Sequence, residues 1–446
     1  MAIFDKYARL RRAVGAGTLH SDRDKILGCL QGHVKRQELP ALVAEPATVA
    51  GVQACVQFAA DKKLPVVVHS GLTQRTAEGI GGKMLLSTVR LVSSPSFLAE
   101  NTRLQVAAGV SLEALQIDLD RYGVRWPPLF PVPKATSIGA LLSAGWQGLR
   151  TWRHGGTLSH VAGVEWVDGE GNLHEAGPET SGTDYVDLLP FLFGSSGELG
   201  IVTRTDLLLE RKPTQRAVCR ISLPQVAEVT RIISLVGLSS PPPDVVLLLD
   251  SGALEIFRGA STPLAADGAR AMIVCEWSES DKRPALPYAH WLDGTREIDE
   301  FWKELFEFPS WTTQKYPAYL EGQVVLPARA FADFEAYTRA FSHEANISAA
   351  LWGTVEVGHL HIWLFLPENE SRLRQQAEHV LEKLQDFSVQ LGGGPTGKVA
   401  PAILKRLGPQ RGSWTSGWRV RAKLKEQFDP HGIFPLRDPL TKNMFA

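Results

Sequence analysis

The sequence predicts an α+β protein built from two parts. Strand-like and helix-like runs alternate from residue 40 onward, and Pro213 closes the first series. From about residue 215 such runs alternate again without parallel crossovers, which favours helices packed on an antiparallel sheet. We therefore expect a first domain over residues 1–213, a second α+β domain with an antiparallel sheet over 214–391, and a separate C-terminal segment over 392–446.

The first part begins with a strand, a helix and a second strand. Residues 40–46 are a short β-prone run between two prolines, and residues 46–64 place apolar side chains at helical spacing. Thr48 stands where a helix N-cap is expected. Residues 65–73 are typical of a buried strand that runs into a glycine turn. This order indicates a βαβ unit.

The remainder of the first part is richer in strands. A helix is expected over residues 111–123, between Ser111 as cap and Gly123 as stop. The other expected elements are strands over 83–88 and 103–109, a tight turn and short helix within 127–148, a hairpin over 163–176, and a helix, glycine turn and strand over 187–213.

The second part combines longer helices with strands. Its strand-like runs are AVCRISLP, DVVLLLD, LEIFRG, AMIVCEW, EGQVVLP and HLHIWLFLP, and its helix-like runs are QVAEVTRIISLVG, ARAFADFEAYTRAFSHEA and SRLRQQAEHVLEKLQDFSVQLG. The tail ends in a helix that Asp429-Pro430 stops.

Composition points to an ordinary globular protein. The chain has 446 residues, 44% of them apolar, and a net charge of −1, so no overall field would attract nucleic acid or anionic lipid. Its four cysteines lack Cys-x-x-Cys spacing, which argues against disulfides and against a metal cluster held by this chain alone. Without a signal-peptide pattern or an apolar stretch of about 20 residues, we expect a cytoplasmic protein that would reach a membrane only through a partner.

Two glycine-containing turns follow extended chain. The first contains His69, Ser70, Gly71, Leu72 and Thr73, and the second contains Thr136, Ser137, Ile138 and Gly139 and leads to Ser143 and Gly145. Such turns let backbone N–H groups converge on a pyrophosphate. Neither has the spacing of a Rossmann or P-loop motif. Each turn alone is also compatible with an ordinary loop, but their order and separation favour cofactor binding.

In these segments the chain resembles the FAD-linked oxidases and dehydrogenases of the vanillyl-alcohol-oxidase, or p-cresol-methylhydroxylase (PCMH), type. Residues 46–73 resemble the family's helix and strand ending in Arg-Gly-Gly-Gly-Thr, residues 136–156 its Thr-Ile-Gly-Gly signature, and residues 194–203 its Gly-Ser-x-Gly-x-Leu-Gly-Ile-x-Thr element. The resemblance implies a two-subdomain FAD-binding PCMH-type domain, an α+β substrate domain, and a C-terminal segment that returns to the FAD-binding domain.

The same resemblance assigns roles to these segments. Residues 70–73 and 136–139 would bind the FAD pyrophosphate with His69 near phosphate, and the adenine and flavin side would be lined by Gly197, Gly200 and Ile201, with Val161 and Val164 flanking. Several relatives attach FAD covalently through a histidine at the position of Thr73, which cannot form that bond. We therefore expect non-covalent FAD, with His154 as a weaker candidate for linkage.

Within the group, 2-hydroxy-acid dehydrogenases of the glycolate and D-lactate type look most similar. Residues 353–361 resemble their Gly-His-x-Gly-Asp-Gly-Asn-x-His strand. Thr354 replaces its metal-binding histidine, and residues 393–397 replace its partner Glu-His. Of the family's metal ligands only His361 is retained here, and His359 is an additional histidine that the family's strand lacks. We therefore expect no metal.

His359 and His361 are two apart in a strand and therefore face the same side, with Trp363. They could act as base and carboxylate partner on the flavin-facing side, or they could be hydrogen-bonded interior histidines. Weaker pocket candidates are Glu321, Gln323, Trp352 and Lys398.

The resulting hypothesis is an FAD-dependent oxidoreductase that oxidises a small 2-hydroxy acid by hydride transfer to flavin N5. Electrons would leave to an iron–sulfur or second flavin subunit, or to a quinone. Two alternatives stay open. One is a sugar or alcohol oxidase that uses oxygen, and the other is a non-catalytic flavin-binding subunit, which the missing ligand positions would suit.

Overall fold

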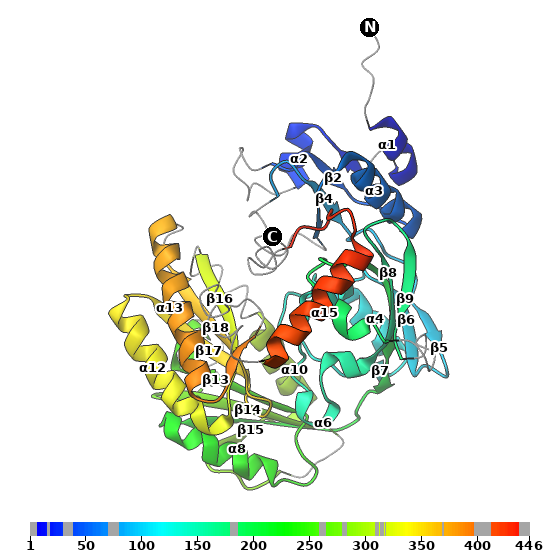
Figure 1. The fold of residues 1–446 in the computed structure, drawn as a ribbon. Helices are drawn as coiled ribbons and strands as arrows, with labels where there is room; N and C mark the ends of the chain where they lie inside the picture. Colours follow the sequence, from blue (N-terminus) through cyan, green and yellow to red (C-terminus); the bar gives the residue numbers. More distant parts are fainter. Residues whose placement is uncertain are drawn as a thin grey trace.

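The structure, a computed structural model, describes residues 7–15, 18–29, 39–69, 80–178, 186–257, 265–278, 283–307, 312, 316, 318–367, 370–396 and 412–436. The N-terminal part, up to Arg211, holds a four-stranded, a five-stranded and a two-stranded sheet, and the following residues build one eight-stranded sheet. Figure 1 shows the large sheet and the N-terminal part side by side, with helix α15 (Gly412–Phe428) lying along the N-terminal part.

The four-stranded sheet has the order β1-β2-β4-β3. Strands β2 (Leu42–Ala44) and β3 (Val66–His69) both pair in parallel with β4 (Met84–Ser87), and β1 (Leu19–His20) is antiparallel to β2. Helix α3 (Val49–Lys62) joins β2 to β3 and is capped by Thr48, as predicted. The βαβ unit is thus confirmed, with β4 inserted between its two strands. Two helices that were not predicted, α1 (Ala8–Val14) and α2 (Arg23–Cys29), precede it.

The five-stranded sheet is antiparallel, in the order β5 (Ser96–Leu98), β6 (Arg103–Ala107), β10 (Ile201–Leu208), β8 (Val161–Val167) and β9 (Leu173–Ala176). Strands β8 and β9 form the predicted hairpin. Helix α4 (Leu112–Arg121) begins at its Ser111 cap and ends before Gly123, which has a φ of 62°. The smaller elements are β7 (Val124–Arg125) paired with β11 (Glu210–Arg211), and helices α5 (Ile138–Ala144), α6 (Thr151–His154), η1 (Thr157–His160) and α7 (Leu189–Leu192).

The eight-stranded sheet confirms the predicted antiparallel topology, because every pairing described within it is antiparallel. Its order is β15 (Ala289–Trp291), β12 (Arg216–Leu223), β14 (Ala271–Ser278), β13 (Val245–Asp250), β17 (Ser348–Thr354), β18 (His359–Leu366), β16 (Ala318–Val325) and β19 (Gly394–Thr396). Strand β19 extends this sheet past the expected boundary at residue 391.

Helices cover both faces of the large sheet. On the outer face α8 (Val229–Gly237), α12 (Phe331–Glu344) and α13 (Ser371–Gln390) share one apolar core with the strands (Figure 1). On the inner face α9 (Ser251–Phe257) and α10 (Gly294–Phe306) pack in a second core, which Leu129 and Trp146 of the N-terminal part also contact. The inner face is therefore the one turned toward the N-terminal part. The short 3-10 turns are η2 (Val226–Glu228) and η3 (Ala328–Ala330).

One predicted strand is wrong. The run LEIFRG, residues 254–259, lies mostly in helix α9. The chain turns into this helix because the Asp250 carboxylate accepts a hydrogen bond from the Ala253 N–H at 2.8 Å. The side chains of Leu254 and Ile256 are buried although the backbone that carries them is helical. A short apolar run does not by itself distinguish strand from helix.

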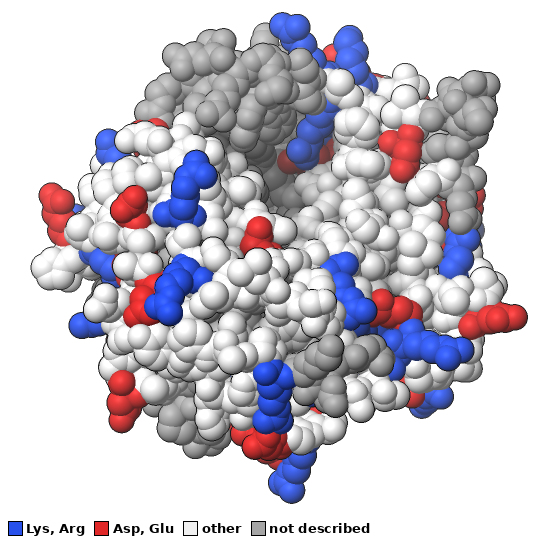
Figure 2. All heavy atoms as spheres, turned by 90° about the horizontal axis from the view of Figure 1, so that it is seen from below, with Lys and Arg blue, Asp and Glu red and all other residues white. Residues whose placement is uncertain are grey.

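The C-terminal segment returns to the N-terminal part, as the resemblance implied. Lys425 Nζ donates to Glu198 C=O at 2.6 Å, and Val66 N–H donates to Ile433 C=O at 2.6 Å. Among the described residues, none of the helices is both long and apolar enough to cross a membrane. Basic and acidic side chains are interspersed over the face seen in Figure 2, which is hollowed near its middle.

Candidate active site

The described parts of the predicted FAD-binding segments meet in the N-terminal part. The Ser196 N–H donates to the Ser143 C=O at 2.7 Å. A Cβ on Gly197 would lie 3.2 Å from the Cβ of Val68, near the end of β3. Backbones this close leave little room for side chains, so glycine is needed where the segments converge. Outside the described residues lie Ser70, Gly71, Leu72 and Thr73.

Helix α5 packs tightly at its start. Ser137 Oγ accepts from the Ala140 N–H at 3.2 Å, as the N-cap. Gly139 N–H donates to the Ala108 C=O at 2.8 Å, and a Cβ on Gly139 would lie 2.8 Å from the Ala108 Cβ. Gly145, with a φ of 70°, closes the helix. The predicted tight turn and short helix are confirmed.

The remaining predicted cofactor residues surround this junction. Ile201 begins β10 and is 1% exposed, and a Cβ on Gly200 would lie 2.5 Å from the Trp166 ring. Val161 and Val164 are buried in the same apolar core as Ile138. Thr136 accepts a backbone hydrogen bond from Leu112, and His69 is buried at the end of β3. The described cofactor segments thus converge on one junction, and the cofactor roles of these residues stay predictions.

The two histidines lie on the inner face of the large sheet. His359 and His361 of β18 have ring centroids 4.9 Å apart, so the predicted common face is confirmed. His361 Nδ1 lies 2.9 Å from Glu321 Oε1 on β16. A carboxylate can only accept, so Nδ1 carries the hydrogen of this contact, and Nε2 is the ring nitrogen that Glu321 does not engage.

Two indoles cover the His361 ring. Trp352 of β17 stacks on it with ring centroids 4.0 Å apart, and Trp146 stacks at 5.4 Å. Trp146 directly follows Gly145, the residue that closes α5. The predicted cofactor segment and the predicted catalytic histidine are therefore in contact. We call His359, His361, Glu321, Trp352 and Trp146 the histidine wall.

The charges of the histidine wall follow from burial and hydrogen bonding. Burial raises the pKa of Glu321, but the hydrogen bond and charge of His361, with hydrogen bonds from Trp363 and Gln323, outweigh it and lower that pKa. Glu321 is thus ionised at neutral pH. For His359, burial and the neighbouring His361 lower the pKa to about 4. His359 is therefore neutral at pH 7, and His361 is the better placed base.

The positions that the resemblance assigned to metal ligands lie nearby. Thr354, at the end of β17, is buried and pairs in register with His359. Residues 393–396 lead into and form β19, next to β16. Within the described ranges no group of three or more His, Cys, Asp and Glu side chains could hold a metal ion. Lys398, a weaker pocket candidate, falls outside those ranges.

Two family profiles match the chain. The FAD binding domain profile matches residues 40–177, and the profile of the FAD linked oxidases, C-terminal domain, matches residues 212–435. The chain belongs to the FAD-linked oxidase family. It is an FAD-dependent oxidoreductase, as the resemblance implied.

Curated relatives of this FAD-linked oxidase are similar over most of its length. D-2-hydroxyglutarate dehydrogenase of Xanthomonas citri pv. viticola is 28% identical, covering 75% of this chain and 74% of the relative. D-lactate dehydrogenase of Anaerostipes hadrus is 22% identical and covers 88% of both chains. Glycolate oxidase subunit GlcD of Bacillus subtilis is 21% identical, covering 89% of this chain and 88% of the relative.

Solved structures share the fold at low sequence identity. 4-Ethylphenol oxidase from Gulosibacter chungangensis superimposes with a TM-score of 0.73 at 14% identity, covering 95% of this chain and 94% of that one. Alkyldihydroxyacetonephosphate synthase has a TM-score of 0.70 at 15% identity, covering 97% and 86%. These likenesses confirm the predicted two-part fold.

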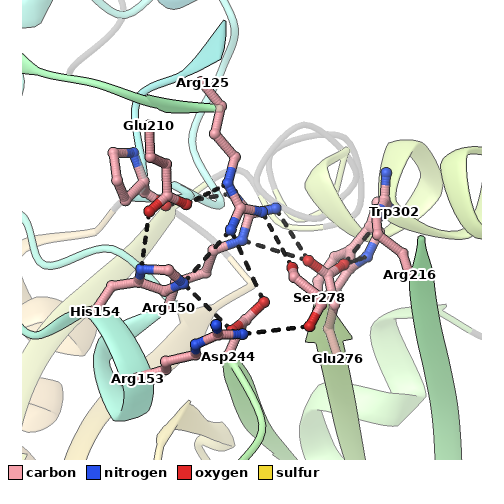
Figure 3. Close-up of polar contacts among 11 residues, drawn as sticks. Arg125, Arg150, Arg153, His154, Glu210, Arg216, Asp244, Glu276, Ser278 and Trp302 are labelled. Carbon is pink, nitrogen blue, oxygen red and sulfur yellow. Dashed lines mark hydrogen bonds and ion pairs between the residues drawn. The ribbon is translucent and has the colours of Figure 1, made fainter. Parts of the chain in front are cut away.

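A second polar cluster joins the two parts of the FAD-linked oxidase through residues 150–154. Arg150 Nη2 donates to Glu276 Oε1 at 3.0 Å, and Thr151 Oγ1 donates to Glu356 Oε1 at 2.6 Å. Trp152 packs against Gly237 of α8. The next two residues, Arg153 and His154, both reach Asp244 (Figure 3). Five consecutive residues thus hold the large sheet, and we call them the interface segment. This role was not predicted, although three of the five residues are basic.

His154 is a centre of this cluster. Its Nε2 lies 3.2 Å from Asp244 Oδ1 and its Nδ1 lies 3.3 Å from Glu210 Oε2 (Figure 3). Burial lowers the pKa of His154, but the bonds to Asp244 and Glu210 outweigh it, so the pKa is raised. Arg125 donates to Glu210 from the same side. Both ring nitrogens are engaged by carboxylates, which argues against His154 as a flavin ligand.

Glu356 should make the stability of the protein pH-dependent. Burial raises the pKa of Glu356 to about 7, against 4.5 for the free side chain. Between these values the unfolded chain has released its proton while the folded chain keeps it, so the free energy of unfolding falls as pH rises through that window. The side chain of a Glu356→Gln variant is neutral at every pH. At pH 8 its free energy of unfolding should exceed that of the natural chain by about 1–3 kcal/mol, and at pH 4.5 the two should differ little.

Chemical denaturation at the two pH values measures this difference. Glu344→Gln, at the exposed end of α12, is the matched control and should follow the natural chain. An equal effect of Glu356→Gln at both pH values would show that the pKa of Glu356 is the same in the folded and unfolded chains.

Proposed function

We propose that this FAD-linked oxidase dehydrogenates a small 2-hydroxy acid of the glycolate or D-lactate type at the histidine wall. The observation that carries the proposal is the Glu321–His361 pair, held against Trp146 next to the predicted FAD turn. A base oriented by a carboxylate is the arrangement that proton abstraction from a hydroxyl group needs. The names of the relatives support the substrate class.

His361 acts as the base in this proposal. Its Nε2 accepts the proton of the C2 hydroxyl as the hydride leaves C2, which yields a 2-oxo acid. Glu321 holds the Nδ1 hydrogen and stabilises the imidazolium that forms. Trp146 and Trp352 fix the plane of the ring. FAD, when bound, supplies the two-electron acceptor for the hydride.

His359 has a separate role. Because its pKa is lowered to about 4 by burial and by His361, it stays neutral and can donate a hydrogen bond to the substrate carboxylate. In this proposal His361 transfers the proton and His359 orients the substrate.

The cofactor would be held by residues 136–139, 143–145 and 194–201 together with the first turn. We propose that it is bound non-covalently, because Thr73 stands at the linkage position and His154 is engaged by Asp244 and Glu210. We also propose that electrons pass to a separate acceptor, an iron–sulfur or second flavin subunit or a quinone. That one relative is named a subunit supports a complex.

Anaerobic reduction of the purified holoenzyme tests the function. Glycolate or lactate should bleach the flavin absorbance, and on mixing with air the reduced enzyme should reoxidise slowly, since oxygen is not its acceptor. Fast reoxidation would favour an oxidase. Bleaching by sugars or simple alcohols but by no 2-hydroxy acid would contradict the proposal, and bleaching by nothing would favour a non-catalytic subunit. Acid precipitation should leave the yellow colour in the supernatant.

A further inference from the structure

Two basic side chains of helix α15 bind the turn of residues 194–200. Arg421 Nη2 donates to Glu198 Oε2 at 2.9 Å and to the Ser195 C=O at 3.4 Å. Lys425 Nζ donates to the Glu198 C=O at 2.6 Å. Arg421 and Ser195 are 226 positions apart, so this turn, which the resemblance assigns to FAD, is held by a segment that is distant in sequence. We call Arg421 and Lys425 the C-terminal clamp.

The Lys425 ammonium has three hydrogen-bond acceptors. Besides the Glu198 C=O, it donates to the Asp429 carboxylate and, at 2.6 Å, to the Phe434 C=O. An ammonium carries three hydrogens and accepts no hydrogen bond, so each hydrogen has one oxygen. The side chain is 9% exposed, and burial of a cation is unfavourable unless it is paired and hydrogen-bonded. Lys425 therefore fixes the position of Glu198 against the end of α15.

The backbone of the turn needs such support. Ser196 has a φ of 55° and Gly197 a φ of 76°. The left-handed conformation costs free energy in a residue with a Cβ, such as serine, and it persists only where the surroundings hold it. Ser195 and Glu198, the two residues that the clamp binds, directly flank this pair. The clamp therefore holds the turn on both sides of its strained part.

One peptide unit connects the clamp to the second predicted cofactor segment. The Ser195 C=O and the Ser196 N–H belong to the same planar peptide unit and point in opposite directions. The carbonyl accepts from Arg421, and the N–H donates to the Ser143 C=O at 2.7 Å. Hydrogen bonds in series polarise one another. Arg421 therefore strengthens the contact between the two segments that the proposed function assigns to FAD.

We propose that Arg421 and Lys425 are positioning residues for FAD. They hold the turn of residues 194–200 in the shape that binds the cofactor, and they act through the backbone of that turn. The affinity for FAD therefore depends on the docking of helix α15 onto the N-terminal part. This inference rests on the cofactor placement in the proposed function and adds to it two residues outside the cofactor segments, whichever substrate the protein oxidises.

The rate at which the holoenzyme releases FAD on dilution, followed by flavin fluorescence, tests the clamp. Lys425→Met removes three hydrogen bonds and should release FAD faster by about tenfold or more. The Arg421 side chain is 30% exposed, so Arg421→Met should accelerate release by only about threefold, and it carries the test if Lys425→Met does not fold. Lys423→Met, at an 81% exposed position of the same helix, is the matched control and should keep the natural rate.

Glu276→Ala separates positioning from general stability. It removes a buried charge from strand β14 of the large sheet, yet it should release FAD at the natural rate. Chemical denaturation of each variant without FAD gives its stability. If Lys425→Met and Glu276→Ala accelerate release equally at a similar loss of stability, the clamp acts only through the fold and the proposal is overturned.

Gly197→Ala tests the placement of FAD separately, because it strains the turn itself. The φ of Gly197 is 76°, and a Cβ there would lie 3.2 Å from the Val68 Cβ. Faster release from Gly197→Ala, with the natural rate in both clamp variants, would overturn the role of the clamp and leave the placement standing. The natural rate in all three variants would refute the placement and the clamp together. Neither result bears on the oxidation of 2-hydroxy acids, which flavin reduction decides.

Discussion

Flavin reduction by the 2-hydroxy acid should slow by about 10²- to 10⁴-fold when His361 is replaced by alanine, the range that general base catalysis contributes. The variant loses the nitrogen that accepts the hydroxyl proton, while Trp146 and Trp352 remain. Single-turnover anaerobic stopped flow measures the reduction rate directly, and flavin content shows whether the cofactor is retained. Glu321→Gln should also lower the reduction rate, but by a smaller factor than His361→Ala. The His361 ring keeps a hydrogen-bond partner in this variant but loses the negative charge that stabilises the imidazolium.

His290→Ala is the control for this variant. His290 is exposed on β15, at the opposite edge of the same sheet, and its loss should leave the reduction rate unchanged. A His361→Ala protein that is reduced within threefold of the natural rate would show that another group takes the proton.

The largest loss of stability is expected for Glu276→Ala, about 3–5 kcal/mol. The Glu276 carboxylate is fully buried and accepts from Arg150 and, at 2.7 Å, from Trp302 Nε1 (Figure 3). Its removal leaves the Arg150 guanidinium buried and without its main counter-charge, and this uncompensated charge is the reason for the loss. Chemical denaturation of the FAD-saturated protein measures the effect.

Asp299→Ala provides the matched comparison for the buried pair. Asp299 pairs with Arg216 at 2.9 Å, but its side chain is 61% exposed, and its removal should cost less than about 1 kcal/mol. Similar losses for both variants would mean that water reaches Glu276 and that the two parts are less tightly joined than the contacts indicate.

Local sequence patterns predicted most regular elements because their signals lie within a few residues. Thr48 and Ser111 cap helices from their own first turns, and alternation in β18 placed His359 and His361 on one face. Helix α9 was predicted as a strand because its capping carboxylate, Asp250, is positioned by tertiary contacts with Arg339 and Leu351. Helix α10 carried a readable amphipathic pattern that the sequence analysis did not use.

The candidate active site was only partly predictable for a related reason. His361 could be predicted as a catalytic residue from a sequence motif. Glu321 could be predicted only as one of several weaker pocket candidates. The stacking of Trp146 on His361 joins residues more than 200 positions apart and depends on how the two parts pack. The interface segment was hidden in the same way, since its partners Asp244, Glu276 and Glu356 are spread along the later chain.

The interface segment limits how this protein can be recombined with its relatives. A chimera that keeps residues 1–211 and takes the rest from a homologue would set Arg150, Arg153 and His154 against a foreign surface in place of Glu276 and Asp244. Transplanting the half that carries the large sheet therefore requires moving residues 150–154 with it, although they lie inside the stretch that the FAD binding domain profile matches. Because Trp146 lies four positions before this segment, such a graft would also affect the indole that stacks on His361.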